Sequence, residues 1–182
     1  MGREFAFLPE RLVMGVLSSD ERAEASAMNR LTEIFGALRF RSAPEPFRWT
    51  DYYCPEMGKD ITRFYIAFER LVDPAQLAVI KRATNALELE LAVDGKRRVN
   101  LDPGMLGTAR FCLATTKDRS HRIPLSDGIY AELTLMFEKK EFKALPWTYP
   151  DWASEPVRLM LGELRKGLLE DLRKQGLLGS HA

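Results

Sequence analysis

Hydrophobic and polar residues alternate in several short segments of this chain and recur at helical intervals in three longer ones. Short apolar or alternating runs predict strands at 12–17, 38–40, 61–72, 97–101, 110–116 and 129–138. Apolar residues three or four positions apart predict helices that follow Ser18 and Asp73, and a last helix from about Glu155 to Lys174. Predicted strands and helices therefore occur along the whole length of the chain.

The first two helices have recognisable end signals. Ser18 and Glu21 have the spacing of a capping box at the start of the first helix. Asp73 followed by Pro74 is a typical start for the second helix. The turn at 94–95, Asp-Gly, is expected to end it.

The order of these elements predicts an α+β fold. Strand, helix, strand, strand, helix, strand is the order of the split βαβ unit of ferredoxin-like folds. Strand then follows strand in the second half, which disfavours a doubly wound parallel sheet. We expect a mainly antiparallel sheet with packed helices, built on an elaborated ferredoxin-like split βαβ core. Residues 1–152 would form a single α+β domain, and 153–182 a C-terminal helix docked on it with a frayed tail that includes His181.

The composition excludes several classes of protein and predicts a soluble, cytoplasmic one. Of the 182 residues 46% are hydrophobic, enough for a full core, yet no apolar stretch is long enough to span a bilayer. Lys and Arg total 27 against 26 Asp and Glu, so the net charge of +1 gives no whole-chain attraction to nucleic acid or membrane. Two cysteines are too few for a disulfide framework. The N-terminal residues do not resemble a signal peptide.

The main functional indication is a polar face shared by three predicted strands. Period two places these polar residues opposite the apolar ones: Arg63, Tyr65 and Glu69; Arg98, Asn100 and Asp102; Tyr130, Glu132 and Thr134. If the three strands are neighbours, the face forms a groove for an anionic ligand, with carboxylates for a divalent metal. The plainer interpretation is the solvated face of an antiparallel sheet, where such alternation is ordinary.

Two loops could add to such a site. Segment 115–122 contains Lys117 and Arg122, which suit a phosphate, and His121, which could transfer a proton near neutral pH. Its alternative is a charged hairpin loop that contacts only water. Tyr52 and Tyr53 could stack a base or sugar, although a loop that covers the core is the preferred interpretation. Phosphate-loop, Gly-x-Gly-x-x-Gly and Gly-x-Ser-x-Gly motifs are absent from the sequence.

Eight segments together carry a family resemblance: 50–53 (TDYY), 57–58 (MG), 84–85 (TN), 94–104 (DGKRRVNLDPG), 115–118 (TTKD), 120–122 (SHR), 127–132 (DGIYAE) and 146–151 (PWTYPD). They resemble the prokaryotic domain of unknown function 4416 family, over most of the chain up to about residue 152. The resemblance implies a single domain. Members are sometimes labelled GTP-binding proteins, but the resemblance brings no established activity and no catalytic residues.

The leading hypothesis is a site for a phosphorylated or otherwise anionic small molecule, such as a nucleotide, on the polar sheet face. The cations that would bind its charge are Arg63, Arg98, Lys117 and Arg122, with Tyr65, Asn100 and Tyr130 as further ligand contacts. Mg²⁺ or Mn²⁺ would be held by Glu69, Asp102 and Glu132, and His121 would exchange a proton in metal-assisted phosphoryl transfer or hydrolysis.

The alternative is a non-enzymatic module that contacts a protein through the C-terminal helix or RNA through local basic loops. The balanced net charge argues against broad RNA binding without excluding a local contact. A closed, concave polar pocket would favour the small-molecule site. A flat polar sheet beside a large exposed apolar helix face would favour the interaction module.

Overall fold

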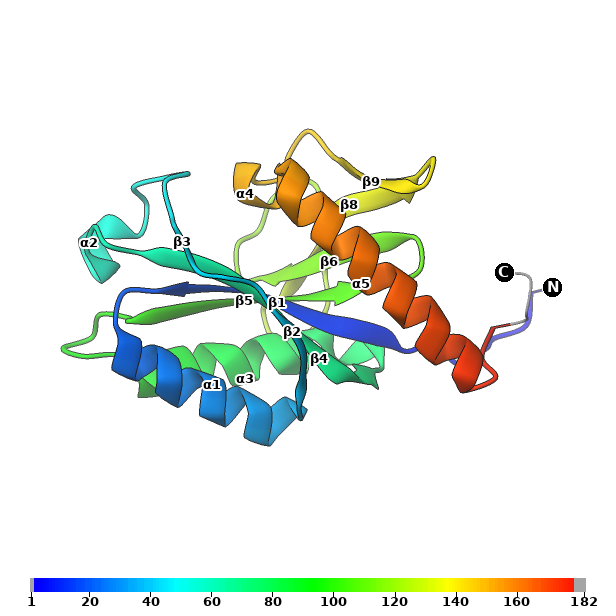
Figure 1. Ribbon diagram of the computed structural model, residues 1–182, viewed down its shortest axis with the longest axis horizontal. Coiled ribbons are helices and arrows are strands. Elements are labelled where there is room, and N and C mark those ends of the chain that lie inside the picture. Colours follow the sequence, from blue (N-terminus) through cyan, green and yellow to red (C-terminus); the bar gives the residue numbers. More distant parts are fainter. Residues whose placement is uncertain (1, 179–182) are drawn as a thin grey trace.

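Nine strands form one antiparallel sheet in the computed structural model, which describes residues 2–178 (Figure 1). The strands are β1 (Glu10–Ser18), β2 (Leu38–Arg41), β3 (Glu45–Pro46), β4 (Thr62–Val72), β5 (Val99–Leu106), β6 (Arg110–Thr115), β7 (Arg122–Pro124), β8 (Tyr130–Glu138) and β9 (Glu141–Ala144). Their order is β2-β4-β1-β5-β6-β8-β7, with β3 also paired to β4 and β9 to β8. The predicted α+β fold with a mainly antiparallel sheet is confirmed.

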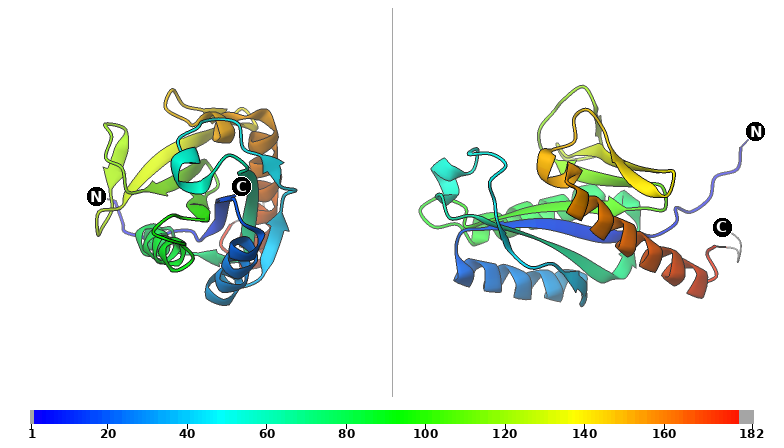
Figure 2. Two further views of the ribbon diagram at one scale, coloured as in Figure 1. Left: turned by 90° about the vertical axis from the view of Figure 1, so that its left-hand side faces the viewer. Right: turned by 45° about the horizontal axis from the view of Figure 1, so that its top comes forward.

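Helices lie on both faces of the sheet (Figures 1 and 2). They are α1 (Glu21–Phe35), α2 (Cys54–Met57), the 3₁₀ turn η1 (Pro74–Gln76), α3 (Leu77–Glu90), α4 (Pro150–Ala153) and α5 (Glu155–Lys174). Helices α1 and α3 cover one face, and α5 crosses the other (Figure 1). No helix in the described part of the chain is both long and apolar enough to cross a membrane.

The first six major elements have the predicted ferredoxin-like arrangement. The chain runs β1-α1-β2-β4-α3-β5, and the four strands lie in the order β2-β4-β1-β5. Each helix therefore connects two strands that have a third strand between them, as in the split βαβ unit. Strands β6 to β9 extend this core beyond β5.

The central strand β1 is buried on both sides, which differs from the solvated face of the plainer interpretation. Leu12 and Met14 pack in the cluster that contains α1 and α3 residues, whereas Val13 packs with Trp152 and α5. The apolar stripe of α5 accounts for the difference, because its buried leucines need an apolar surface and the second sheet face supplies it. Polar residues of that face are consequently enclosed.

The ends of several elements also differ from the expected ones. Asp20, not Ser18, is the N-cap of α1, and its carboxylate accepts the backbone N–H of Ala23 at 2.8 Å. Helix α3 ends at Glu90, before the Asp-Gly turn at 94–95. Helix α5 has the predicted bounds. The predicted frayed tail, with His181, falls on residues 179–182, which lie outside the described residues.

Candidate functional site

A cavity of about 700 Å³ lies beside the first half of β5, where the sheet opens. Strand β6 pairs only with the last three residues of β5, 104–106. The preceding half of β5 therefore has no strand beside it on that edge within residues 2–178. Residues of β4, β5, β6, β7, β8, α3 and α4 line the cavity, together with the loop 47–53.

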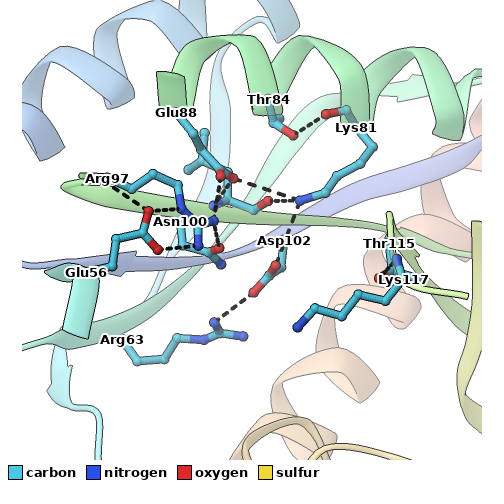
Figure 3. A network of polar contacts seen from close by, with 11 residues as sticks. Glu56, Arg63, Lys81, Thr84, Glu88, Arg97, Asn100, Asp102, Thr115 and Lys117 are labelled. Carbon is cyan, nitrogen blue, oxygen red and sulfur yellow. Dashed lines mark hydrogen bonds and ion pairs between the residues drawn. The ribbon is translucent and has the colours of Figure 1, made fainter. Parts of the chain in front are cut away.

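Two side chains of α3 take the place of the missing strand (Figure 3). Leu101 of β5 donates its backbone N–H to Glu88 Oε1 at 2.7 Å, and its carbonyl accepts from Lys81 Nζ at 2.7 Å. Pro103 is two residues further along β5, so its backbone nitrogen faces the same open edge as that of Leu101. Proline has no N–H that would need an acceptor there. Glu88 and Lys81 are both buried, at 4% and 7% exposure.

Glu88 also connects the open edge to Arg97. Arg97 Nη1 donates to Glu88 Oε2 at 2.9 Å and to Asn100 Oδ1 at 2.7 Å, and its Nε and Nη2 donate to Glu56 (Figure 3). Burial raises the pKa of Glu88, an effect that Lys81 and Arg97 oppose. The pair Glu88 and Arg97 thus fixes the end of the cavity that lies nearest α2.

Arg63 forms a second charged centre, enclosed between two carboxylates. Its Nη1 lies 3.2 Å from Asp102 Oδ2, and its Nη2 lies 2.9 Å from Asp151 Oδ2. Burial opposes the charged guanidinium, but Tyr65 and the two carboxylates outweigh it and raise the pKa of Arg63. Burial likewise raises the pKa of Asp151, and Arg63 opposes that rise. Arg63 therefore stays charged in the interior and compensates two acids.

A glycine makes room for this buried cation. The Arg63 guanidinium lies over the rings of Tyr65 and Trp152, 4.9 and 5.3 Å from their centroids. Gly15 of β1 lies directly beneath, where a Cβ would stand 2.4 Å from Arg63 Nη2 and 2.9 Å from the Trp152 ring. Any larger residue at this position would displace the guanidinium from its carboxylates.

The opposite wall of the cavity contains Arg122 and Glu132. Arg122 Nε donates to Glu132 Oε2 at 2.7 Å, and Nη1 donates to the carbonyl of Lys117 at 2.8 Å. His121 Nε2 lies 3.1 Å from the same carboxylate oxygen, and the imidazole stacks on Trp147 with centroids 4.9 Å apart. His121 itself does not line the cavity, so it contacts the site only through Glu132.

Four of the exposed lining residues are Trp49, Tyr52, Lys117 and Tyr149, and we refer to these four as the mouth of the cavity. Lys117 Nζ lies 4.2 Å from the centroid of the Tyr52 ring, a cation–π contact between two loops. No carboxylate among the residues that the structure describes lies within ion-pair distance of this ammonium.

Buried hydrogen-bonding capacity remains open around the cavity. Asn100 Nδ2 and Glu132 Oε1 are buried atoms that have no hydrogen-bond partner within the described chain. Lys81 uses one of its three donors, for Leu101, and its carboxylate neighbours lie 3.9 and 4.0 Å away. Buried polar groups are usually satisfied, so these three lining residues have hydrogen-bonding capacity left for a bound molecule or for ordered water.

Comparison with known proteins gives a family and nothing more specific. Residues 8–167 match the profile described as Domain of unknown function (DUF4416). The chain belongs to this family. No curated protein and no solved structure gives a significant match. The family resemblance expected from the sequence is therefore confirmed, and the site must be interpreted from its own geometry.

The structure brings six of the predicted site residues together at the DUF4416 cavity: Arg63, Asn100, Asp102, Lys117, Arg122 and Glu132. Tyr65 lies behind Arg63 and is buried. Arg98, His121 and Tyr130 do not line the cavity. Glu69 lines a separate pocket of about 310 Å³ beside Asp171.

The three carboxylates predicted as metal ligands are consequently not gathered into one group. Asp102 pairs with Arg63, and Glu132 pairs with Arg122, while Glu69 is in the other pocket. No cluster of three or more His, Cys, Asp or Glu side chains in residues 2–178 is placed to hold a metal ion. Glu69 was expected on the same polar sheet face as Asp102 and Glu132, but it does not reach the cavity.

Several lining residues were not predicted from the sequence, above all Lys81 and Glu88. Both continue the spacing of the buried stripe of α3, which includes Leu77, Thr84 and Leu87. Two charged residues, a lysine and a glutamate seven positions apart, lie on this otherwise uncharged stripe. Their position was the indication in the sequence that both side chains would be buried. Asp151 had no comparable local indication, because only the packing of α4 brings it to Arg63.

Proposed function

We propose that this cavity binds a phosphorylated or otherwise anionic small molecule, with nucleotides as the first candidates. The observation that carries the proposal is the ammonium of Lys117 at the mouth, which contacts the Tyr52 ring and is not paired with a carboxylate of the described chain. Of the five lining cations in the described chain, the other four each lie within 4.0 Å of a carboxylate: Arg63, Lys81, Arg97 and Arg122. Among these five lining cations of the described chain, Lys117 is thus the one whose charge a ligand can neutralise without competing with a carboxylate.

The shape and polarity of the cavity support the same function. A volume of about 700 Å³ is within the usual range for small-molecule pockets. The open donors of Lys81 and Asn100 can meet phosphate, hydroxyl or carbonyl oxygens. A concave site of this kind favours a small molecule over the alternative of a flat protein- or RNA-interaction surface.

Binding is the first function to test, and metal-assisted phosphoryl transfer or hydrolysis follows from it. Asp102 and Glu132 are the lining carboxylates that a phosphate-bound Mg²⁺ or Mn²⁺ could reach, and each is held by an arginine. A metal would therefore have to compete with that arginine for the carboxylate. Experiments with and without divalent metal separate simple binding from metal-dependent binding.

Thermal and chemical denaturation with nucleotides and other phosphorylated metabolites provides the test. A bound ligand at about 100 times its dissociation constant is expected to add about 2.7 kcal/mol to the free energy of unfolding. Lys117→Gln is expected to weaken binding about tenfold or more, because it removes a charge-assisted contact worth about 1.5–3 kcal/mol.

The matched control is Lys166→Gln on the exposed side of α5, far from the cavity lining. This variant should bind like the wild type. Equal affinities for Lys117→Gln and Lys166→Gln would contradict the proposed role of Lys117. Absence of any stabilisation across the panel would contradict the small-molecule site and favour a protein or RNA partner, to be sought by co-purification.

A further inference from the structure

We infer that the ligand of this cavity carries a flat aromatic ring as well as an anionic group, as nucleoside phosphates do, and that Tyr52 stacks on this ring while Lys117 binds the anion. The inference rests on the proposed function and narrows it. It separates nucleoside phosphates and similar aromatic phosphates from sugar phosphates and inorganic phosphate, which would need only the cation.

The first observation is the exposure of the aromatic residues at the mouth. Trp49, Tyr52 and Tyr149 line the cavity but remain 53%, 61% and 47% exposed, whereas Trp152, at the inner end, is 2% exposed. The three exposed rings come from two segments far apart in the sequence, the loop 47–53 and the residue before α4. Three large exposed rings around one polar cavity are more than a phosphate site requires. Aromatic rings of this kind are the usual stacking partners of bases.

The second observation is that the loop holds Tyr52 in place from one side. The Tyr52 ring meets Tyr53 edge-on, with centroids 5.1 Å apart, and Tyr53 in turn packs against Phe47 at 5.9 Å. Tyr53 and Phe47 are partly buried and pack against the buried cluster that includes Leu17 and Met57. The exposed Tyr52 ring is thus supported by packed aromatic neighbours, which lowers the conformational entropy lost when a ligand stacks on it.

The third observation is the contact that the ligand would replace. Lys117 Nζ lies over the Tyr52 ring at 4.2 Å, so the ammonium and the ring are each other's partners across the mouth. An anion that binds Lys117 draws the ammonium from the ring and uncovers its face. A ligand with both an anionic group and a ring therefore satisfies both halves of the contact, whereas a sugar phosphate leaves the Tyr52 face exposed to water.

The interior of the cavity fits the polar remainder of such a molecule. Lys81 has two donors free of hydrogen bonds, and Asn100 Nδ2 has no partner in the described chain. Sugar hydroxyls or ring carbonyls would satisfy these donors. The cavity therefore offers an aromatic and cationic mouth and a hydrogen-bonding interior, which together provide contacts for a ring, a phosphate and a sugar.

The test compares the four common nucleoside 5′-monophosphates with ribose 5-phosphate and inorganic phosphate in calorimetric titrations. At least one nucleotide is expected to bind about tenfold more tightly than ribose 5-phosphate. Tyr52→Leu is expected to weaken nucleotide binding about tenfold and to leave ribose 5-phosphate binding unchanged, because stacking on an aromatic side chain is lost. Tyr52→Phe keeps the ring and should bind like the wild type.

The outcomes separate this inference from the proposed function. If ribose 5-phosphate or phosphate binds as tightly as every nucleotide, or if Tyr52→Leu binds nucleotides like the wild type, the ring inference is wrong while the anion site stands. If none of the probes binds, both are wrong. Tyr52 is exposed, so melting temperatures that match the wild type are expected for both variants and show that an affinity loss does not come from misfolding.

Discussion

Replacing Arg63 with leucine is expected to lower the free energy of unfolding by about 3–5 kcal/mol. The substitution removes the only cation within ion-pair distance of Asp151 in the described chain, and it leaves Asp102 with Lys81 at 4.0 Å. Asp151 is buried, so its charge becomes uncompensated in the interior. Chemical denaturation of the two proteins measures the loss.

The same variant should show a characteristic pH dependence. Burial already raises the pKa of Asp151, and Arg63 opposes the rise, so the pKa of Asp151 rises further without Arg63. A folded-state pKa above the unfolded value means that the folded protein binds more protons and loses stability as pH increases through that pKa. The deficit of Arg63→Leu relative to the wild type is therefore expected to be larger at pH 8 than at pH 5.

Arg70→Leu is the matched control, because Arg70 is an exposed residue of the same strand. It should change stability by less than about 0.5 kcal/mol, as is usual for surface substitutions. A deficit for Arg63→Leu as small as that of the control would contradict the account of Arg63. So would a deficit that is the same at both pH values.

Replacing Glu88 with alanine is expected to cost a similar amount, about 3–5 kcal/mol. The substitution removes one of the two carboxylates near the buried Lys81 ammonium, leaves Asp102 at 4.0 Å, and deprives the Leu101 N–H of its acceptor. Arg97 loses one of its two carboxylates as well. Hydrogen exchange at the Leu101 amide should accelerate more than at neighbouring β5 amides, which localises the effect to the open edge.

The control for this prediction is Glu90→Ala, an exposed position on the same helix. It should be nearly neutral and should leave exchange at Leu101 unchanged. Equal stability of the two alanine variants would show that Glu88 does not take the place of a strand at this edge.

Much of the fold could be predicted from the sequence because its determinants are local. The alternation in β4 and β8, the cap and proline before α3 and the long apolar stripe of α5 each specify an element without reference to the rest. Their order was enough for the split βαβ core. Burial of the second sheet face was not predicted, because alternation does not say whether a polar face is solvated or covered by another element.

The site was only partly predictable for the same reason. Period two selects Arg63, Asn100 and Asp102 correctly as neighbours on one face, and the structure places all three at the cavity. Arg98 follows the same spacing, but β5 begins at Val99, so the strand phase does not extend to it. The cavity itself depends on where β6 separates from β5, which no short-range pattern records. For this reason the positions of Lys81 and Glu88 on the buried stripe of α3 did not by themselves indicate a cavity.

The three tryptophans allow the most direct test of the central claim that the ligand occupies this cavity. Trp49 lines the mouth and Trp152 the interior, whereas Trp147 lies outside, with its Nε1–H donated to the carbonyl of Leu133 at 2.8 Å. Titration with a nucleotide, followed by the indole N–H resonances in ¹⁵N-labelled protein, is expected to shift Trp49 and Trp152 and to leave Trp147 nearly unchanged. Saturable binding that shifts Trp147 and neither of the other two would contradict the account.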